Sequence, residues 1–302
     1  NAAIADVIAE RRTRLTELAP VAALLVVVPA YGAMRIATLP PATGAPVAVG
    51  LVQGNVDIGA QWDEAMYGRN LDVYLGLTAD LARTDAPALI VWPENGLTFF
   101  LEDEPAYRAA IARVLAPAGV ELLAGGPRTA DLPAGRAYFN SMFLLDADGV
   151  IRGRYDKQRL VPFGERFPLP HVAALARRFQ RVRELNPGPF DDPVATVAGS
   201  AGIVICSEAM FPEIAARRVG DGATFLVDPA HDTWVTIVDP LGRVVTRSDF
   251  STRAAVRGTV EPRSDHTIYQ RVGDLFAVAC AIAAVGALLG ALAGAVRKTP
   301  RA

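Results

Sequence analysis

Two long stretches of the chain lack charged residues, and they dominate its hydrophobic pattern. Residues 18–34 and residues 275–296 contain no Asp, Glu, Lys or Arg. A helix needs roughly 20 apolar residues to cross a bilayer, so the second stretch is long enough and the first is slightly short. We expect both stretches to form transmembrane helices. A signal peptide is the alternative for the first stretch, although no small-residue cleavage site follows it.

Basic residues on the outer flanks of these stretches predict their orientation. Three arginines lie within residues 1–17, and three basic residues lie within residues 297–302. By the positive-inside rule, both ends of the chain are then cytoplasmic. The predicted organisation is a cytoplasmic lead-in (1–17), a span (18–35), a linker (36–46), an extracytoplasmic catalytic domain (47–272), a span (273–296) and a cytoplasmic tail (297–302).

Between the two stretches, short apolar runs alternate with segments of helical spacing. This alternation is typical of an α/β protein whose strands are covered on both faces. The expected strands are residues 47–52, 88–92, 120–125, 141–145, 150–156, 201–206 and 223–227, with a hairpin at 236–239 and 243–246. The expected helices are residues 70–83, 104–115 and 211–220.

The connection after residue 227 is too short for such a fold. The next strand begins at residue 236, whereas a crossover between parallel strands needs at least roughly ten residues. Either the protein connects these strands differently, or residues are missing near 234–236. We favour missing residues, and the start at Asn1 rather than Met also suggests a fragment.

Composition narrows the range of functions. The net charge is −2 and there is no long basic run, so a nucleic-acid partner is not expected.

The two cysteines are Cys206 and Cys280, and Cys280 lies inside the second predicted span. Cys206 is therefore expected to be a free thiol, either a nucleophile or a buried structural residue. The three histidines are scattered without ligand spacing, so neither a metal nor another cofactor is expected.

Three residues with complementary chemistry follow predicted strands. Cys206 ends one expected strand, Glu94 follows another, and Lys157 follows a third. A thiolate is the reactive form of cysteine, a buried carboxylate is suited to proton transfer, and an amine can stabilise an oxyanion. Taken singly, Glu94 could be a solvated loop carboxylate and Lys157 a surface lysine. Together the three residues indicate nucleophilic catalysis.

These segments resemble the Glu-Lys-Cys triad of the nitrilase superfamily, and most closely its membrane-bound branch, the apolipoprotein N-acyltransferase family. The resemblance covers nearly the whole chain. The matching motifs, in order, are Gln53-Gly54-Asn55, Trp92-Pro93-Glu94, Tyr155-Asp156-Lys157, Val161-Pro162-Phe163-Gly164-Glu165, Ile205-Cys206-Ser207-Glu208 and residues 267–274. The implied fold is a nitrilase-like α-β-β-α sandwich flanked by transmembrane helices.

The resemblance also implies a reaction and a location. Cys206 would take a fatty acyl chain from a phospholipid as a thioester and pass it to the N-terminal α-amine of a diacylglyceryl-cysteine lipoprotein. Glu94 would act as base, and Lys157 would stabilise the oxyanion with a backbone N–H near Ser207. The implied site is on the extracytoplasmic side of the bacterial cytoplasmic (inner) membrane.

Two further glutamates are supporting candidates. Glu165 would orient Lys157. Glu208 would support the site or merely cap the helix that follows it.

Aromatic residues near the motifs are candidates for contact with the lipid substrate. For the apolar loop at residues 97–101, the alternative is ordinary core packing. Residues 171–184 combine apolar spacing with arginines, which is typical of a helix that lies on a membrane surface or of an ordinary solvated helix. The candidate substrate-binding residues are Trp62, Phe99, Phe100, Phe163 and Trp234.

Three departures from the family pattern stand out. The family usually has eight spans and this chain shows two. About thirty residues that normally follow the Trp234 segment are absent, and Ser207 replaces an aromatic residue that is frequent after the nucleophile.

Two rival functions remain open. A membrane-tethered amidase would use the same triad with water in place of the amine. A catalytically silent scaffold would bind a membrane partner.

Overall fold

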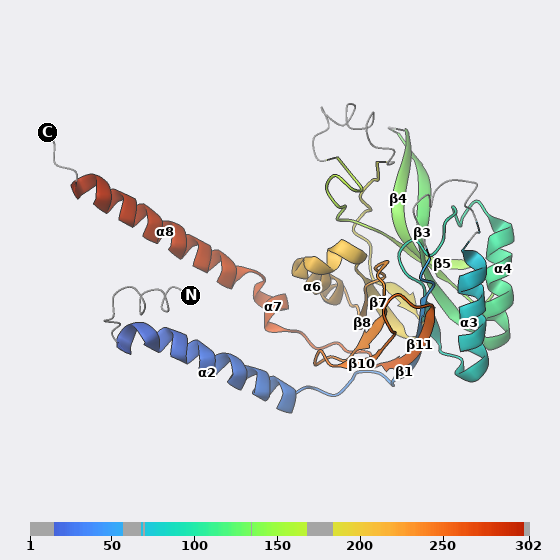
Figure 1. Cartoon of the computed structure of the whole chain (residues 1–302), viewed down its shortest axis with the longest axis horizontal. Coiled ribbons are helices and arrows are strands. Elements are labelled where there is room, and N and C mark those ends of the chain that lie inside the picture. The colour runs from blue at the N-terminus through green and yellow to red at the C-terminus, as the bar shows by residue number, and fades with distance from the viewer. Residues whose placement is uncertain (1–14, 57–67, 69, 134, 168–183, 299–302) are drawn as a thin grey trace. The chain divides into compact units, whose positions relative to one another are not determined.

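The computed structural model describes residues 15–56, 68, 70–133, 135–167 and 184–298 (Figure 1). The chain divides into two compact units, Asn1–Pro41 and Ala42–Ala302. The described helices are α2 (Leu15–Ala37), α3 (Leu71–Asp85), α4 (Pro105–Leu115), α6 (Pro212–Gly220), α7 (Ile268–Val272) and α8 (Leu275–Lys298), with the short 3-10 helices η2 (Ala116–Ala118) and η3 (Cys206–Met210). The strands are β1 (Val47–Gln53), β2 (Leu89–Val91), β3 (Glu121–Leu132), β4 (Gly135–Leu145), β5 (Ile151–Asp156), β6 (Val194–Thr196), β7 (Gly199–Ile203), β8 (Phe225–Val227), β9 (Thr236–Val238), β10 (Val244–Arg247) and β11 (Ala254–Val260).

The first unit contains α2, and the second unit ends in α8. Both helices expose large apolar side chains, among them Leu25 in α2 and Phe276 in α8. Within the part of the chain that the structure describes, no helix has both the length and the apolar character needed to cross a membrane. The two transmembrane spans therefore stay a prediction.

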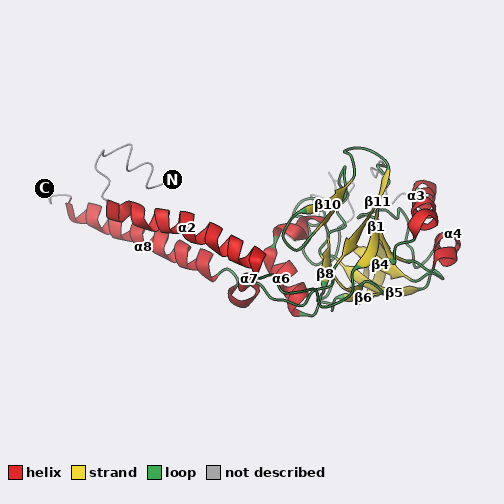
Figure 2. Cartoon of the chain, turned by 90° about the horizontal axis from the view of Figure 1, so that it is seen from below, coloured by secondary structure: helices red, strands yellow, loops and turns green. Residues whose placement is uncertain are grey.

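A six-stranded sheet forms the centre of the second unit. Its strand order is β11-β1-β2-β3-β4-β5. The neighbours β1, β2 and β3 run parallel, and β11, β4 and β5 pair with their neighbours antiparallel. Parallel neighbours need crossover connections, and α3 and α4 provide them. Both helices lie on one face of this sheet (Figure 2).

Two hydrophobic cores lie on opposite faces of the large sheet. Ile90 and Leu122 pack on one face with residues of α3 and α4, including Tyr74 and Ile111. Their neighbours along the strands, such as Leu89, point to the other face and pack with residues of β7. This alternation follows from the two-residue period of a strand. The predicted layering, with apolar strands covered on both faces, is confirmed.

The second sheet consists of β6, β7 and β8 only. The strands β9 and β10 form a separate hairpin, and residues 228–235 join β8 to β9 without a helix. A connection of this length cannot carry a helical crossover, so β9 does not continue the sheet beside β8. In this sequence residues 228–235 reach the hairpin directly, and the missing residues near 234–236 stay a prediction.

The expected strands and helices all occur, with some differences at their ends. The strand expected at residues 201–206 ends at Ile203, and Cys206 instead begins η3. The strands β6 and β11 were not expected; β11 runs antiparallel to β1 at the edge of the large sheet. Its apolar alternation is weak on its own, and the pairing with β1 stabilises it.

Two adjacent glycines let the loop after β2 approach the large sheet. A Cβ atom at Gly125 would lie 2.5 Å from the carbonyl oxygen of Pro93 and 2.8 Å from Cα of Glu94. A Cβ atom at Gly126 would lie 2.7 Å from Cβ of Leu97. Both neighbours of Gly125 are backbone atoms, which cannot move aside as the end of a flexible side chain can.

Replacing Gly125 with alanine is therefore expected to destabilise the protein. Forcing the loop away from β3 is an overpacking effect, and such changes cost about 1–3 kcal/mol. The free energy of unfolding, measured by urea denaturation, checks this. The matched control is Gly76→Ala in the middle of α3, where nothing lies within 4 Å of the added methyl group. It should be neutral or stabilise the protein by up to ~1 kcal/mol. Equal stability of the two variants would contradict this view of the loop.

Candidate active site

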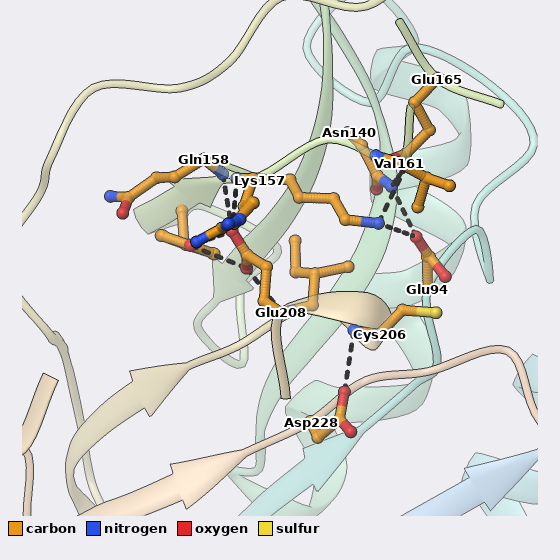
Figure 3. Close-up of polar contacts among 12 residues, drawn as sticks. Glu94, Asn140, Lys157, Gln158, Val161, Glu165, Cys206, Glu208 and Asp228 are labelled. Atoms are coloured by element: carbon orange, nitrogen blue, oxygen red, sulfur yellow. Dashed lines mark hydrogen bonds and ion pairs between the residues drawn. The ribbon is translucent and has the colours of Figure 1, made fainter. Parts of the chain in front are cut away.

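The ends of three strands bring Glu94, Lys157 and Cys206 together (Figure 3). Glu94 follows β2, Lys157 follows β5, and Cys206 lies three residues after β7. Glu94 and Lys157 are buried, and Cys206 is partly buried. The three residues predicted to act together from the sequence are thus neighbours in the structure.

Lys157 is a buried cation held between two carboxylates. Its Nζ lies 2.9 Å from Oε1 of Glu165 and 3.3 Å from Oε1 of Glu94, and 1% of its side chain is exposed. Burial by itself lowers the pKa of Lys157, but the charges of Glu94 and Glu165 outweigh it and leave this pKa raised. Lys157 therefore stays protonated at neutral pH.

Asn140 joins the two carboxylates from the opposite side. Its Nδ2 donates to Oε1 of Glu94 at 2.6 Å and to Oε1 of Glu165 at 3.1 Å. Its backbone oxygen accepts from the N–H of Lys157 at 2.8 Å. The amide oxygen Oδ1 is buried without a hydrogen-bond partner among the described residues. The hydrogen bonds that Nδ2 donates to the two carboxylates offset the free-energy cost of burying this oxygen. Asn140 was not predicted from the sequence; the available signal was its position directly before the expected strand at residues 141–145.

Glu165 also holds the turn that contains it. Its Oε2 accepts from the backbone N–H of Val161 at 2.7 Å. Within this turn, Phe163 has a φ of 65° and an exposed ring. Glu165 thus orients Lys157 and shapes the exposed turn at the same time.

Glu208 connects the nucleophile segment to the end of β5. Its carboxylate accepts from the backbone N–H groups of Ile205, Gln158 and Arg159 at 2.8–2.9 Å. The hydroxyl of Tyr155 donates to the same carboxylate at 2.9 Å. Glu208 is fully buried. It therefore caps η3 from within that helix, rather than the helix that follows, and ties η3 to the segment directly after Lys157.

Cys206 has a left-handed backbone conformation and a protonated thiol. Its φ is 53°, which residues with a side chain rarely adopt. Burial first and the charge of Glu94 second raise the pKa of Cys206 to about 11, while Lys157 and the N–H of Ser207 act in the opposite direction. The thiol also hydrogen-bonds to Glu94. At neutral pH the sulfur therefore keeps its proton, with an acceptor beside it.

The family of this chain follows from a comparison with known protein families. Residues 48–248 match the model of the carbon-nitrogen hydrolases. The chain belongs to the carbon-nitrogen hydrolase family. The match contains all three residues of the site and runs from β1 to the hairpin of β9 and β10, ahead of β11.

Curated relatives of this carbon-nitrogen hydrolase carry a more specific name. It is 29% identical over 295 residues to the apolipoprotein N-acyltransferase of Geobacter metallireducens, a match that covers 86% of this chain and 56% of the relative. It is 36% identical over 230 residues to that of Rhizobium meliloti, covering 72% of this chain and 42% of the relative. The chain spans about half the length of the curated relatives that it matches.

Solved structures agree with this carbon-nitrogen hydrolase in fold. The NitFhit protein of C. elegans superposes with a TM-score of 0.54 at 17% identity, over 73% of this chain and 62% of that one. An amidase from Nesterenkonia sp. superposes with a TM-score of 0.52 at 17% identity, over 72% of this chain and 91% of that one. The nitrilase-like α/β fold expected from the sequence is thus confirmed.

The predicted substrate-binding residues that the structure describes have different aromatic neighbours. Phe99 is buried in the core and its ring lies 4.5 Å from that of Tyr107, so the loop at residues 97–101 is core packing, as the alternative held. Phe100 is partly buried near Tyr138, and the ring of Trp234 lies 5.7 Å from that of Phe250. Trp62 and most of residues 171–184 lie outside the described residues.

Two further expectations concern Ser207 and a metal. Ser207 is partly buried and directly follows Cys206. Among the residues that the structure describes, His, Cys, Asp and Glu form no group of three that could hold a metal ion.

Neutralising Glu94 is expected to make the thiol of Cys206 more acidic. Glu94→Gln removes the charge that raises the pKa of Cys206, and each unit by which this pKa falls gives about tenfold more thiolate at neutral pH. Alkylation by iodoacetamide near pH 8, followed by mass spectrometry of the Cys206 peptide, should therefore become faster. The control is Glu213→Gln, since Glu213 is an exposed carboxylate paired with Arg159. An alkylation rate unchanged or slowed in Glu94→Gln would contradict this electrostatic account.

Proposed function

We propose that this chain carries the catalytic domain of an N-acyltransferase. It would transfer a fatty acyl group from a phospholipid to the α-amine of a diacylglyceryl-cysteine at the N-terminus of a lipoprotein. The observation that carries the proposal is the grouping of a protonated thiol, a carboxylate and a buried ammonium in one site. The similarity to relatives named apolipoprotein N-acyltransferase supports the choice of substrates.

In the first half of the reaction, the sulfur of Cys206 attacks the ester carbonyl of the phospholipid. Glu94 takes the thiol proton as the carbon–sulfur bond forms. The tetrahedral intermediate then breaks its bond to the alkoxide oxygen, and the lyso-phospholipid leaves with the proton from Glu94. The pKa of Cys206, about 11, favours this concerted proton transfer over a preformed thiolate.

In the second half, the neutral α-amine of the lipoprotein attacks the thioester. Glu94 takes a proton from the attacking nitrogen, the carbon–sulfur bond breaks, and the thiolate recovers the proton. The products are an amide and the free thiol. One carboxylate can serve both halves because it returns to its ionised form after each of them.

The oxyanion of each tetrahedral intermediate needs hydrogen-bond donors. The buried ammonium of Lys157 is one, since its two carboxylates keep it charged. The N–H of Ser207, which already interacts with the sulfur, is the other. The N–H of Cys206 is engaged elsewhere, because it donates to Oδ1 of Asp228 at 2.8 Å. Glu165 and Asn140 act as positioning residues for Lys157 and Glu94.

The two terminal helices would anchor this domain in the membrane. Large apolar side chains along α2 and α8, such as Val26 and Ile282, are more than 60% exposed. We infer that they insert into the bacterial cytoplasmic membrane, with residues 47–272 as the extracytoplasmic domain and residues 1–17 and 297–302 in the cytoplasm. A phospholipid donor would then be present at high local concentration.

An amidase that transfers the acyl group to water is the second candidate. The fold shared with an amidase from Nesterenkonia sp. favours it. Both candidates would form a thioester on Cys206, but the amidase would take its acyl group from an amide, release an amine and pass the acyl group to water. A silent scaffold is less well supported, because a scaffold needs no buried Lys157 between two carboxylates.

Incubation with phospholipid is expected to add one acyl chain to Cys206. Intact-mass analysis of the full chain should show an adduct that hydroxylamine removes, as it does a thioester. Cys206→Ala should show no adduct, and Lys157→Met should form it roughly 100- to 1,000-fold more slowly because an oxyanion donor is lost. The matched control is Cys280→Ala, which removes the other free thiol and should leave the adduct intact.

The acceptor then separates the two candidates. A diacylated lipopeptide should consume the adduct and gain one acyl chain by mass if the protein is an acyltransferase. Loss of the adduct at the same rate with and without lipopeptide, and release of free fatty acid, would instead show transfer to water. A parent chain that forms no adduct in phospholipid vesicles would refute the acyltransferase.

Membrane insertion predicts that Cys280 is protected from water-soluble reagents. In vesicles, Cys280 within α8 should react slowly with a membrane-impermeant maleimide and rapidly after solubilisation and denaturation. Thr252→Cys in the Cys206→Ala background serves as the comparison, since Thr252 is exposed on the second unit. Equal labelling of the two positions in vesicles would rule out burial of α8 in lipid.

A further inference from the structure

Three consecutive backbone N–H groups at the nucleophile each have a defined acceptor. Val204 donates to the carbonyl oxygen of Val227 at 2.9 Å. Ile205 donates to Oε2 of Glu208, and Cys206 donates to Oδ1 of Asp228, both at 2.8 Å. The last bond is drawn in Figure 3. The turn is thus fixed by one strand pairing and two carboxylates.

This arrangement counteracts the unfavourable conformation of Cys206. A left-handed residue with a side chain costs roughly 1–2 kcal/mol, so an unsupported turn would relax. Relaxation would move the sulfur away from Glu94. Because its N–H is bonded to a carboxylate, Cys206 is held by a charge-assisted hydrogen bond, which is about twice as strong as a neutral one.

The segment after β8 holds the general base as well as the nucleophile. The parallel pairing of β7 and β8, in which Ile203 lies opposite Val227, brings Asp228 beside the turn. The next residue, Pro229, accepts a hydrogen bond at its carbonyl oxygen from the backbone N–H of Glu94. Two adjacent residues therefore set the positions of both reacting groups.

We propose that Asp228 is a positioning residue that holds Cys206 in its reactive conformation, and that it does so best as a carboxylate. This role rests on the proposed function, in which Cys206 is the nucleophile. Asp228 acts through the backbone of Cys206 and touches no substrate.

The charges around Asp228 place its protonation near neutral pH. Burial first, then the charges of Asp232 and Glu94, raise the pKa of Asp228 to about 6, although Lys157 and the N–H of Cys206 lower it. His231 lies on the same segment, with Nδ1 buried and without a partner among the described residues. Below about pH 6 the carboxyl group is neutral and accepts a weaker hydrogen bond from Cys206.

The test compares Asp228→Ala, which removes the acceptor, with Asp228→Asn, which keeps an acceptor oxygen and removes the charge. The probe is p-nitrophenyl octanoate, whose ester carbonyl is attacked by Cys206 with release of p-nitrophenol. The measured quantity is the rate of the initial burst of p-nitrophenol by the full chain in detergent. At about pH 8, Asp228→Ala should slow the burst roughly 10- to 100-fold, and Asp228→Asn should stay within about fivefold of the parent.

The pH profile separates positioning from a merely structural role. The burst rate of the parent should fall as the pH drops through about 6. Asp228→Asn should lack this acid limb, because it has no carboxyl group to protonate. Asp232→Asn is the matched control, and its rate at about pH 8 should be unchanged. An unaltered rate in Asp228→Ala, or an acid limb that persists in Asp228→Asn, would overturn the proposal.

Hydrogen–deuterium exchange provides a measurement that needs no activity. The peptide containing Cys206 should exchange faster in Asp228→Ala than in the parent, and Asp228→Asn should restore protection. Asp228→Asn is expected to fold. The pKa of Asp228 is raised in the folded protein, so above about pH 4 its ionised form opposes folding, and a neutral side chain at this position removes that cost. If acyl transfer to lipopeptide fails while these differences hold, the proposed acceptor is wrong and the role of Asp228 stands. Equal exchange in all three proteins would refute that role.

Discussion

The buried ammonium of Lys157 is the group on which the rest of the site depends. Removing a charged amine from water costs several kcal/mol unless opposite charges and hydrogen bonds replace its hydration. Glu94 and Glu165 do so, and each has to be held in turn by further donors: Asn140 for both, and the N–H of Val161 for Glu165. The need to neutralise one cation therefore joins the end of β2, the middle of β4, the end of β5 and the turn at residues 161–166.

Burial and the charge of Glu94 together decide the protonation of the thiol. Both raise the pKa of Cys206, burial the more, and Lys157 offsets them only in part. Lys157 is thereby available to stabilise negative charge on oxygen, where it develops during the reaction.

The sequence was sufficient for the layers, for the three residues of the site and for Glu165, but not for the rest of their support. Glu94, Lys157 and Cys206 each lie at or just after the end of an expected strand, and such ends can meet in space. Asn140 lies inside β4, and Asp228 lies in a loop. Their importance comes from contacts with residues 46 and 22 positions away in the sequence. No local pattern encodes such contacts.

The left-handed backbone of Cys206 creates a conflict between stability and chemistry at a single residue. Glycine adopts this conformation without steric cost, so it would suit the turn better than any other residue. Glycine has no sulfur, however, and the reaction would be lost with it. Selection for folding alone would therefore favour replacing Cys206 with glycine. A cysteine at this position is unfavourable for folding and fits the proposed role of its thiol.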